Sequence, residues 1–161
     1  MSIQGLAQLL TQRLQLQWVL RHFGGVTAFY AFIAIGLVEA SLGVLLPSIL
    51  QAFQLTTVTV TLLFLSQISG YLVADLGLSV ISHTLGLGRM MLLAAGLLTT
   101  TLVIYATTPM WGLMVAAGVL LGLGIGLIDA GINTYMVRDV EQADRIGAMH
   151  GCYGIGALTM G

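Results

Sequence analysis

Apolar residues form four unbroken runs, each long enough for a helix that crosses a bilayer. These runs cover residues 24–46, 58–80, 90–106 and 111–136, and short polar breaks separate them. A membrane-spanning helix needs about 17 to 25 mostly apolar residues. A fifth apolar run begins at 146 and continues to the last residue, 161, which is short of a full span at about 1.5 Å per residue. We therefore predict an all-α fold with four complete membrane spans and a truncated fifth, and we expect this chain to be the front part of a longer protein.

The leader, residues 1–23, is more polar than the runs that follow it. Its apolar residues Leu6, Leu10 and Leu14 recur every four positions beside glutamines and an arginine. This spacing favours a helix that lies on the membrane surface before the first span. An unstructured leader is the alternative.

Positive charge falls on one side of this arrangement. The five basic residues are Arg13, Arg21, Arg89, Arg138 and Arg145, and they precede span one, separate spans two and three, or separate spans four and five. The other two breaks contain none. Because positively charged loops stay on the cytoplasmic side, we predict a multi-pass protein of the cell membrane with its N-terminus in the cytoplasm.

Composition supports this class and excludes others. The chain is 58% hydrophobic and 7% charged, whereas a soluble domain has about 25% charged residues. It has no lysine and no basic run that would bind nucleic acid. One cysteine and three separated histidines give no metal-ligand spacing, and no nucleophile–base pair suggests an enzyme. We expect the lipid bilayer as a partner, and no cofactor and no metal.

Two phrases inside the spans nearly repeat each other and each contains one acid. Gly36-Leu-Val-Glu39-Ala40 lies in the first run and Gly126-Leu-Ile-Asp129-Ala130 in the fourth. An ionisable group at the centre of a bilayer costs roughly 2.5–3.5 kcal/mol on insertion scales, so such groups are functional by default. A structural alternative is a buried acid that bonds a neighbouring hydroxyl.

The order of the spans makes this pair resemble an inverted repeat. With three spans between their starts, the first and fourth helices run in opposite directions across the membrane. Many secondary transporters are built from such inverted repeats, with solute and ion sites between the copies. Chance similarity between Gly- and Leu-rich helices is the competing explanation.

Three segments are similar to the major facilitator superfamily, in particular to its fucose-permease-like sugar:proton symporters. They are the glycine-rich segment 122–133, the segment 45–53 with its Leu-Leu-Pro, and the segment 149–157 with Met-His-Gly-Cys-Tyr-Gly-Ile-Gly. The resemblance implies a twelve-helix transporter in two halves, of which this chain holds most of the first. Its partners would be the missing C-terminal half, a small-molecule substrate and protons.

The resemblance also ranks the two acids. Asp129 matches a proton-coupling position on the fourth helix of these carriers. Their first helix has an acid at the place where this chain has Gly43, and Glu39 lies one turn earlier. The usual loop signature between spans two and three is reduced to Gly88-Arg89, so Asp75 is a possible partner for Arg89, or else an ordinary interfacial charge.

Other polar and aromatic residues of the spans are candidates to bind a solute. We predict that the substrate contacts come from Asn133, Gln67, His150, Tyr153 and Tyr30, with Phe29 or Tyr71 as further rings that could stack on a sugar. Asn133 shares a helix face with Asp129, because they are four residues apart. Helix packing is the alternative role for Gln67 and for the serines near it, Ser66 and Ser69, and for His150. Gly118, Gly122, Gly126 and Ala130 recur every four residues, which predicts a smooth ridge for close helix contact.

The function that fits these features is proton-coupled uptake of a neutral solute such as a sugar, by alternating access. Asp129 would bind the proton with Glu39 as its partner. A carrier of anions normally needs Arg or Lys in its cavity, and the spans have neither. The alternatives are efflux of lipophilic or cationic compounds and a non-transporting fragment that acts as a membrane assembly partner.

Overall fold

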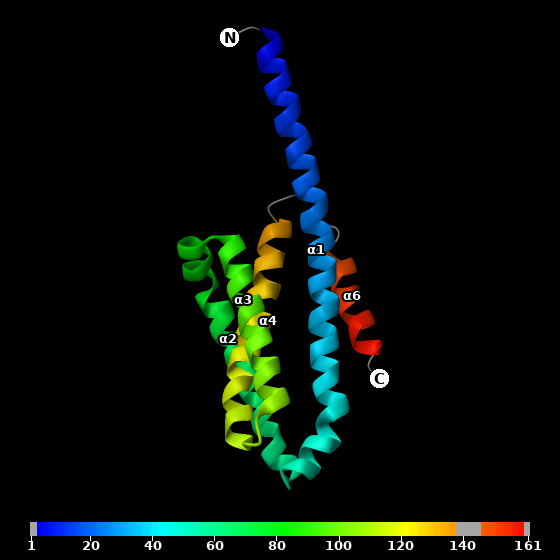
Figure 1. The fold of residues 1–161 in the computed structure, drawn as a ribbon, viewed down its shortest axis with the longest axis vertical. Coiled ribbons are helices and arrows are strands. Elements are labelled where there is room, and N and C mark those ends of the chain that lie inside the picture. The colour runs from blue at the N-terminus through cyan, green and yellow to red at the C-terminus, as the bar shows by residue number, and fades with distance from the viewer. Residues whose placement is uncertain (1–2, 138–145, 160–161) are drawn as a thin grey trace.

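The computed structural model of the chain describes residues 3–137 and 146–159, and all of its regular structure there is helical. The helices are α1 Ile3–Ala52, α2 Thr57–Leu85, α3 Leu87–Thr107, α4 Trp111–Val137 and α6 Ile146–Leu158. Successive helices run in opposite directions, so that α1 is antiparallel to α4 and α2 is antiparallel to α6 (Figure 1). The prediction of an all-α fold is confirmed.

Four of these helices are long and apolar enough to cross a membrane. The segments are Val26–Ala52, Thr57–Leu85, Leu87–Thr107 and Trp111–Met136. Large apolar side chains such as Val58, Leu76 and Leu92 are more than 70% exposed on them, which suits a surface that contacts lipid. The four predicted spans therefore exist as helices.

The first helix is longer at both ends than its apolar run. It includes the leader from Ile3 onward and continues through Pro47 to Ala52, where we expected a break to begin at Pro47. A proline has no N–H for the fourth preceding carbonyl but does not always end a helix. The chain reverses only after Ala52, at Gln54, whose φ is 52°.

Helix α2 has clear signals at both ends. The Thr56 side chain accepts a hydrogen bond from the Thr59 N–H, which satisfies one unpaired donor of the first turn. Gly86, with φ of 73°, ends the helix in a conformation that favours glycine. The expected break at 81–89 is thus only one residue, and α3 starts directly at Leu87.

The helices pack in two groups, α2–α3–α4 and α1–α6. The predicted glycine ridge of α4 is confirmed. A Cβ at Gly122 would meet the backbone of Gln67 and Tyr71, and one at Gly118 would meet Ser66. At these glycines the backbones of α4 and α2 lie in close contact, as small residues allow in membrane proteins.

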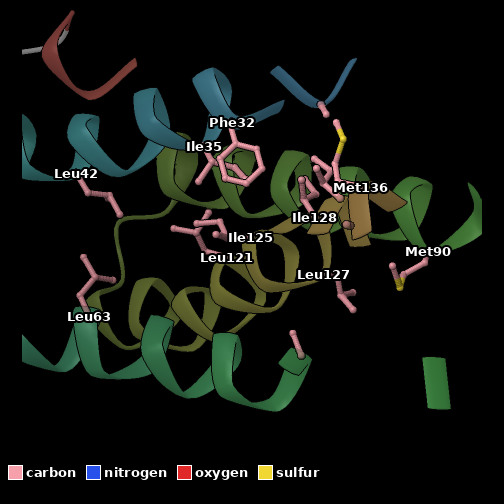
Figure 2. Packing of buried hydrophobic residues seen from close by; sticks show 14 of the residues in the cluster. Phe32, Ile35, Leu42, Leu63, Met90, Leu121, Ile125, Leu127, Ile128 and Met136 are labelled. Atoms are coloured by element: carbon pink, nitrogen blue, oxygen red, sulfur yellow. The ribbon is translucent and has the colours of Figure 1, made fainter. Parts of the chain in front are cut away.

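An apolar cluster joins the two groups. Phe32 and Ile35 of α1 face Leu121 and Ile125 of α4 (Figure 2). All four side chains are at most 5% exposed. The space beside this cluster contains the two acids.

Candidate functional site: a cavity with two carboxylates

The two acids lie on helices from different groups. Glu39 is at the midpoint of the α1 span Val26–Ala52, and Asp129 is in the second half of α4. Both side chains are half-buried. Each lies three residues after a buried glycine, Gly36 or Gly126.

Glu39 accepts hydrogen bonds at both carboxylate oxygens. The Gln67 amide of α2 donates from Nε2 to Oε1 at 3.2 Å, and the Tyr153 hydroxyl of α6 donates to Oε2. Glu39 therefore links its own helix to one neighbour in each group.

Asp129 also accepts at both oxygens. The Asn133 amide donates from Nδ2 to Oδ1 at 3.1 Å, one turn further along α4. The Tyr71 hydroxyl of α2 donates to Oδ2. Each acid therefore has one amide donor and one phenol donor.

These donors explain how the acids are tolerated in a membrane span. A hydrogen bond to a charged group is worth roughly 1.5–3 kcal/mol. Two such bonds are enough to offset the roughly 2.5–3.5 kcal/mol that a charge at the bilayer centre costs. All four donors are neutral amides or phenols, so they add no positive charge beside either carboxylate.

A cavity of about 180 Å³ lies between these acids. Its lining comes from four helices and consists of Phe32, Ile35, Glu39, Tyr71, Ile125, Asp129, His150 and Tyr153. The His150 ring packs against Phe32 with ring centres 5.0 Å apart and a tilt of 56°. The cavity thus combines an apolar wall, aromatic faces and two carboxylates.

The charge of this cavity is unbalanced. None of the residues in its described lining is Arg or Lys. Such a site can bind protons, cations or groups that donate hydrogen bonds, and it repels anions. No three His, Cys, Asp or Glu side chains in the described part of the chain form a group that could hold a metal ion.

The structure brings most of the predicted site residues together. Glu39, Asp129, His150 and Tyr153 line one cavity, and Gln67 and Asn133 bind its acids. These contacts put the predicted residues in one place, while their roles in transport stay predictions.

Three predicted residues lie elsewhere. Tyr30 is 70% exposed on α1 and does not line the cavity. Asp75 and Arg89 are exposed on α2 and α3, and no ion pair between these two side chains is present in the structure. Arg138 and Arg145 of the predicted positive side fall outside the described residues.

Sequence reasoning missed the partner of Asp129 and the apolar wall. The sequence predicts Tyr71 only as a ring that could stack on a sugar, whereas its hydroxyl donates a hydrogen bond to Asp129. One signal was available: Gln67 and Tyr71 are four residues apart and so share a face of α2. Ile35 and Ile125 directly precede Gly36 and Gly126 and so extend the repeated phrase, whereas Phe32 has no distinguishing signal in an apolar helix.

Comparison with known proteins gives two relatives. The chain is 33% identical over 136 residues to Bypass of stop codon protein 6 of Saccharomyces cerevisiae, which covers 83% of this chain and 27% of the relative. It is 28% identical over 133 residues to the Glucose/mannose transporter GlcP of Bacillus subtilis, which covers 80% of this chain and 32% of the relative. The chain thus spans roughly a quarter to a third of the length of these curated relatives.

Comparisons with family models and with solved structures assign this chain to no family. No protein-family model matches the chain, and no solved structure matches it. Four membrane-length helices in the described residues indicate a multi-pass membrane protein, and one of its relatives is a named sugar transporter.

Proposed function

We propose that this chain forms part of a proton-coupled secondary transporter, rather than an enzyme, which takes up a small neutral solute such as a sugar by alternating access. The observation that supports this most is the cavity with two carboxylates, both held only by neutral donors among the described residues. A solute with hydroxyl groups can donate to such acids, and a proton can bind them. Neither event requires a metal or a cofactor.

The two acids have different proposed roles. Asp129 binds and releases the coupling proton, because both of its donors come from the closely packed α2–α4 pair. Glu39 is its partner and faces the same cavity from α1. The donors Asn133, Gln67 and Tyr153, together with His150, offer further polar contacts to a solute.

The size and the walls of the cavity favour a small solute. At about 180 Å³ it is below the roughly 300–1,000 Å³ typical of pockets for drug-sized ligands. Phe32 presents a ring at the wall, on which the apolar face of a sugar can pack. A polar solute of about monosaccharide size suits this combination.

Similarity to a named sugar transporter also supports a transport function. The Glucose/mannose transporter GlcP matches most of this chain, although this chain covers only 32% of it. We propose that the complete protein has the major-facilitator architecture, with a C-terminal half that closes the solute path. We also propose the cell membrane as its location, with the N-terminus in the cytoplasm, on the basis of the arginine positions.

Efflux of cationic compounds is the second candidate. The specific observation that favours it is the absence of Arg and Lys from the described lining of a cavity with two acids. An organic cation would pair with these carboxylates directly. Competition between sugars and lipophilic cations distinguishes the two functions.

The test is transport by the intact protein in liposomes with an imposed proton gradient. Uptake of radiolabelled hexoses is measured for the natural protein and for Asp129→Asn, together with gradient-free exchange across the same membranes. We expect Asp129→Asn to reduce gradient-driven accumulation at least roughly tenfold, which corresponds to about 1.4 kcal/mol of lost coupling, and to retain exchange. Retained exchange shows that the variant is folded and binds the solute.

Two results would contradict the proposal in different ways. Unchanged accumulation in Asp129→Asn removes Asp129 as the coupling group. Absence of any hexose uptake by the natural protein, combined with proton-driven movement of a lipophilic cation, favours efflux. Absence of both activities leaves the role of a membrane assembly partner.

A further inference from the structure

Each acid is bonded by a tyrosine from the helix packed against it, and the two arrangements match. Tyr153 of α6 bonds Glu39 of α1, and Tyr71 of α2 bonds Asp129 of α4. In both pairs the other oxygen of the carboxylate accepts from an amide. Both tyrosines line the cavity.

The glycine before each acid lies close to the backbone of the tyrosine in both pairs, although the nearest atom to Gly126 is the Ala74 Cβ at 2.8 Å. A Cβ at Gly36 would collide with the carbonyl oxygen of Tyr153, and one at Gly126 would lie 3.1 Å from the carbonyl oxygen of Tyr71. The glycine therefore lets the tyrosine backbone approach the helix one turn before the acid. This approach brings the phenol within reach of the carboxylate.

The directions of the helices make the two pairs equivalent. Because α1 is antiparallel to α4 and α2 is antiparallel to α6, a two-fold exchange would turn the α1–α6 pair into the α4–α2 pair (Figure 1). Under this exchange Tyr153 corresponds to Tyr71. The acid and the tyrosine are further apart in sequence in the first copy, where Ala40–Gly70 separates them, than in the second, where Ala130–Cys152 does. Aligning the two copies on their acids therefore does not align their tyrosines.

A phenol is well suited to hold a carboxylate without neutralising it. Its hydroxyl donates one hydrogen bond and adds no positive charge. A tyrosine has few rotatable bonds, and its ring is packed at the cavity wall, so the bonded oxygen is fixed in place. The acid then meets a proton or a solute hydroxyl in one orientation.

We propose that Tyr71 and Tyr153 are a repeated pair of positioning residues, each of which comes from the helix facing its acid and orients that carboxylate toward the cavity. Tyr71 positions Asp129 and Tyr153 positions Glu39. This inference rests on the proposed function only for the reason why the carboxylates are oriented. The tyrosine–acid contacts themselves can be tested without a transport assay.

The first test is infrared difference spectroscopy of the purified intact protein between low and high pH. The carboxyl band of Asp129 is the one lost in Asp129→Asn, and that of Glu39 is the one lost in Glu39→Gln. We expect Tyr71→Phe to shift the Asp129 band alone and Tyr153→Phe to shift the Glu39 band alone. Tyr105→Phe is the matched control, because the Tyr105 hydroxyl is buried on α3 without a hydrogen-bond partner among the described residues.

A second measurement covers an acid that does not titrate in the accessible range. Thermal unfolding is compared for Tyr71→Phe, Asp129→Asn and the double variant, and for the crossed combination of Tyr71→Phe with Glu39→Gln. Contacting residues show non-additive effects, whereas independent ones add. We expect non-additivity for Tyr71 with Asp129 and for Tyr153 with Glu39, and additivity for the crossed pairs.

The outcomes separate this inference from the proposed function. Shifted bands or paired non-additivity support the tyrosine–acid pairs even if the protein transports no hexose. Unshifted bands together with additive effects overturn the pairs even if Asp129 is essential for uptake. Band shifts of equal size for both acids in a single tyrosine variant also overturn the proposal, because they indicate a general disturbance of the cavity.

Discussion

The helix pair around Asp129 and the pair around Glu39 contain the same parts in different surroundings. Both have a glycine, an acid and a tyrosine from the facing helix. Around Asp129, α4 packs against α2 on one side and α3 on the other, and the amide donor Asn133 belongs to α4 itself. Around Glu39, α1 packs mainly against α6, and the amide donor Gln67 comes from the other group.

Because of this difference, the hydrogen bonds of the two acids depend differently on the packing of the two helix groups. The site of Asp129 is complete within one closely packed group. The site of Glu39 is complete only when the two groups are in contact, because Gln67 belongs to α2 while Tyr153 belongs to α6. Glu39 therefore depends on the relative position of the groups, and Asp129 does not.

The largest expected effect compares one closely packed glycine from each helix pair, Gly122 of α4 and Gly36 of α1. A Cβ at Gly122 would collide with the Gln67 carbonyl oxygen and lie 2.8 Å from the Tyr71 nitrogen. Overpacking costs about 1–3 kcal/mol. We expect Gly122→Ala to lower the free energy of unfolding in detergent by about 3 kcal/mol. We expect about 2 kcal/mol for Gly36→Ala, because its Cβ would overlap less with the Tyr153 carbonyl oxygen than that of Gly122 would with the Gln67 carbonyl oxygen.

The control for these variants is Gly96→Ala on α3, where a Cβ would meet nothing within 4 Å. Alanine favours a helix over glycine by roughly 0.5–1 kcal/mol, so this variant is expected to be slightly more stable. A larger loss in Gly36→Ala than in Gly122→Ala would show that α1–α6 is the more rigid pair.

A medium effect is expected at the amide donors. Gln67→Ala removes a hydrogen bond between the groups, and Asn133→Ala removes one within α4. Each bond is worth about 1 kcal/mol or somewhat more. Only Gln67→Ala is expected to loosen α1–α6 from α2, and a change of that size raises the open fraction about fivefold.

Cys152 reports this loosening without an engineered label. It is the one cysteine of the chain and is partly exposed on α6. We expect its rate of reaction with a membrane-permeant thiol reagent to rise about fivefold in Gln67→Ala and to stay constant in Asn133→Ala. Equal rates in both variants would show that Glu39 does not depend on the contact between the groups.

The smallest effect is expected away from both acids. The Tyr105 hydroxyl is buried without a hydrogen-bond partner in the described part of the chain. Removing an unsatisfied polar group is neutral or stabilising by up to about 1 kcal/mol. Tyr105→Phe should therefore keep or raise the unfolding temperature, and a clear decrease would mean that this hydroxyl has a partner in the membrane.

Local pattern in the sequence was enough to predict the membrane-spanning helices and to single out the two acids as candidate site residues. Runs of apolar residues gave the four spans, and the four-residue spacing of Gly118, Gly122 and Gly126 gave the face of α4 that packs closely. Acids in apolar runs are conspicuous because of their cost, so Glu39 and Asp129 stood out. Hydropathy overstated two breaks, since α1 continues through Pro47 to Ala52 and only Gly86 separates α2 from α3.

Only the tertiary structure decided which side chains meet. Tyr30 and Tyr71 look alike in the sequence, yet Tyr30 is 70% exposed and Tyr71 bonds Asp129. The pairing of α1 with α6 placed Tyr153 on Glu39, and the packing of α2 beside both acids placed Gln67 on Glu39 and Tyr71 on Asp129. The physical reason is that hydropathy and helical spacing are properties of one segment, whereas the partner of a helix face depends on how all the helices fill space together.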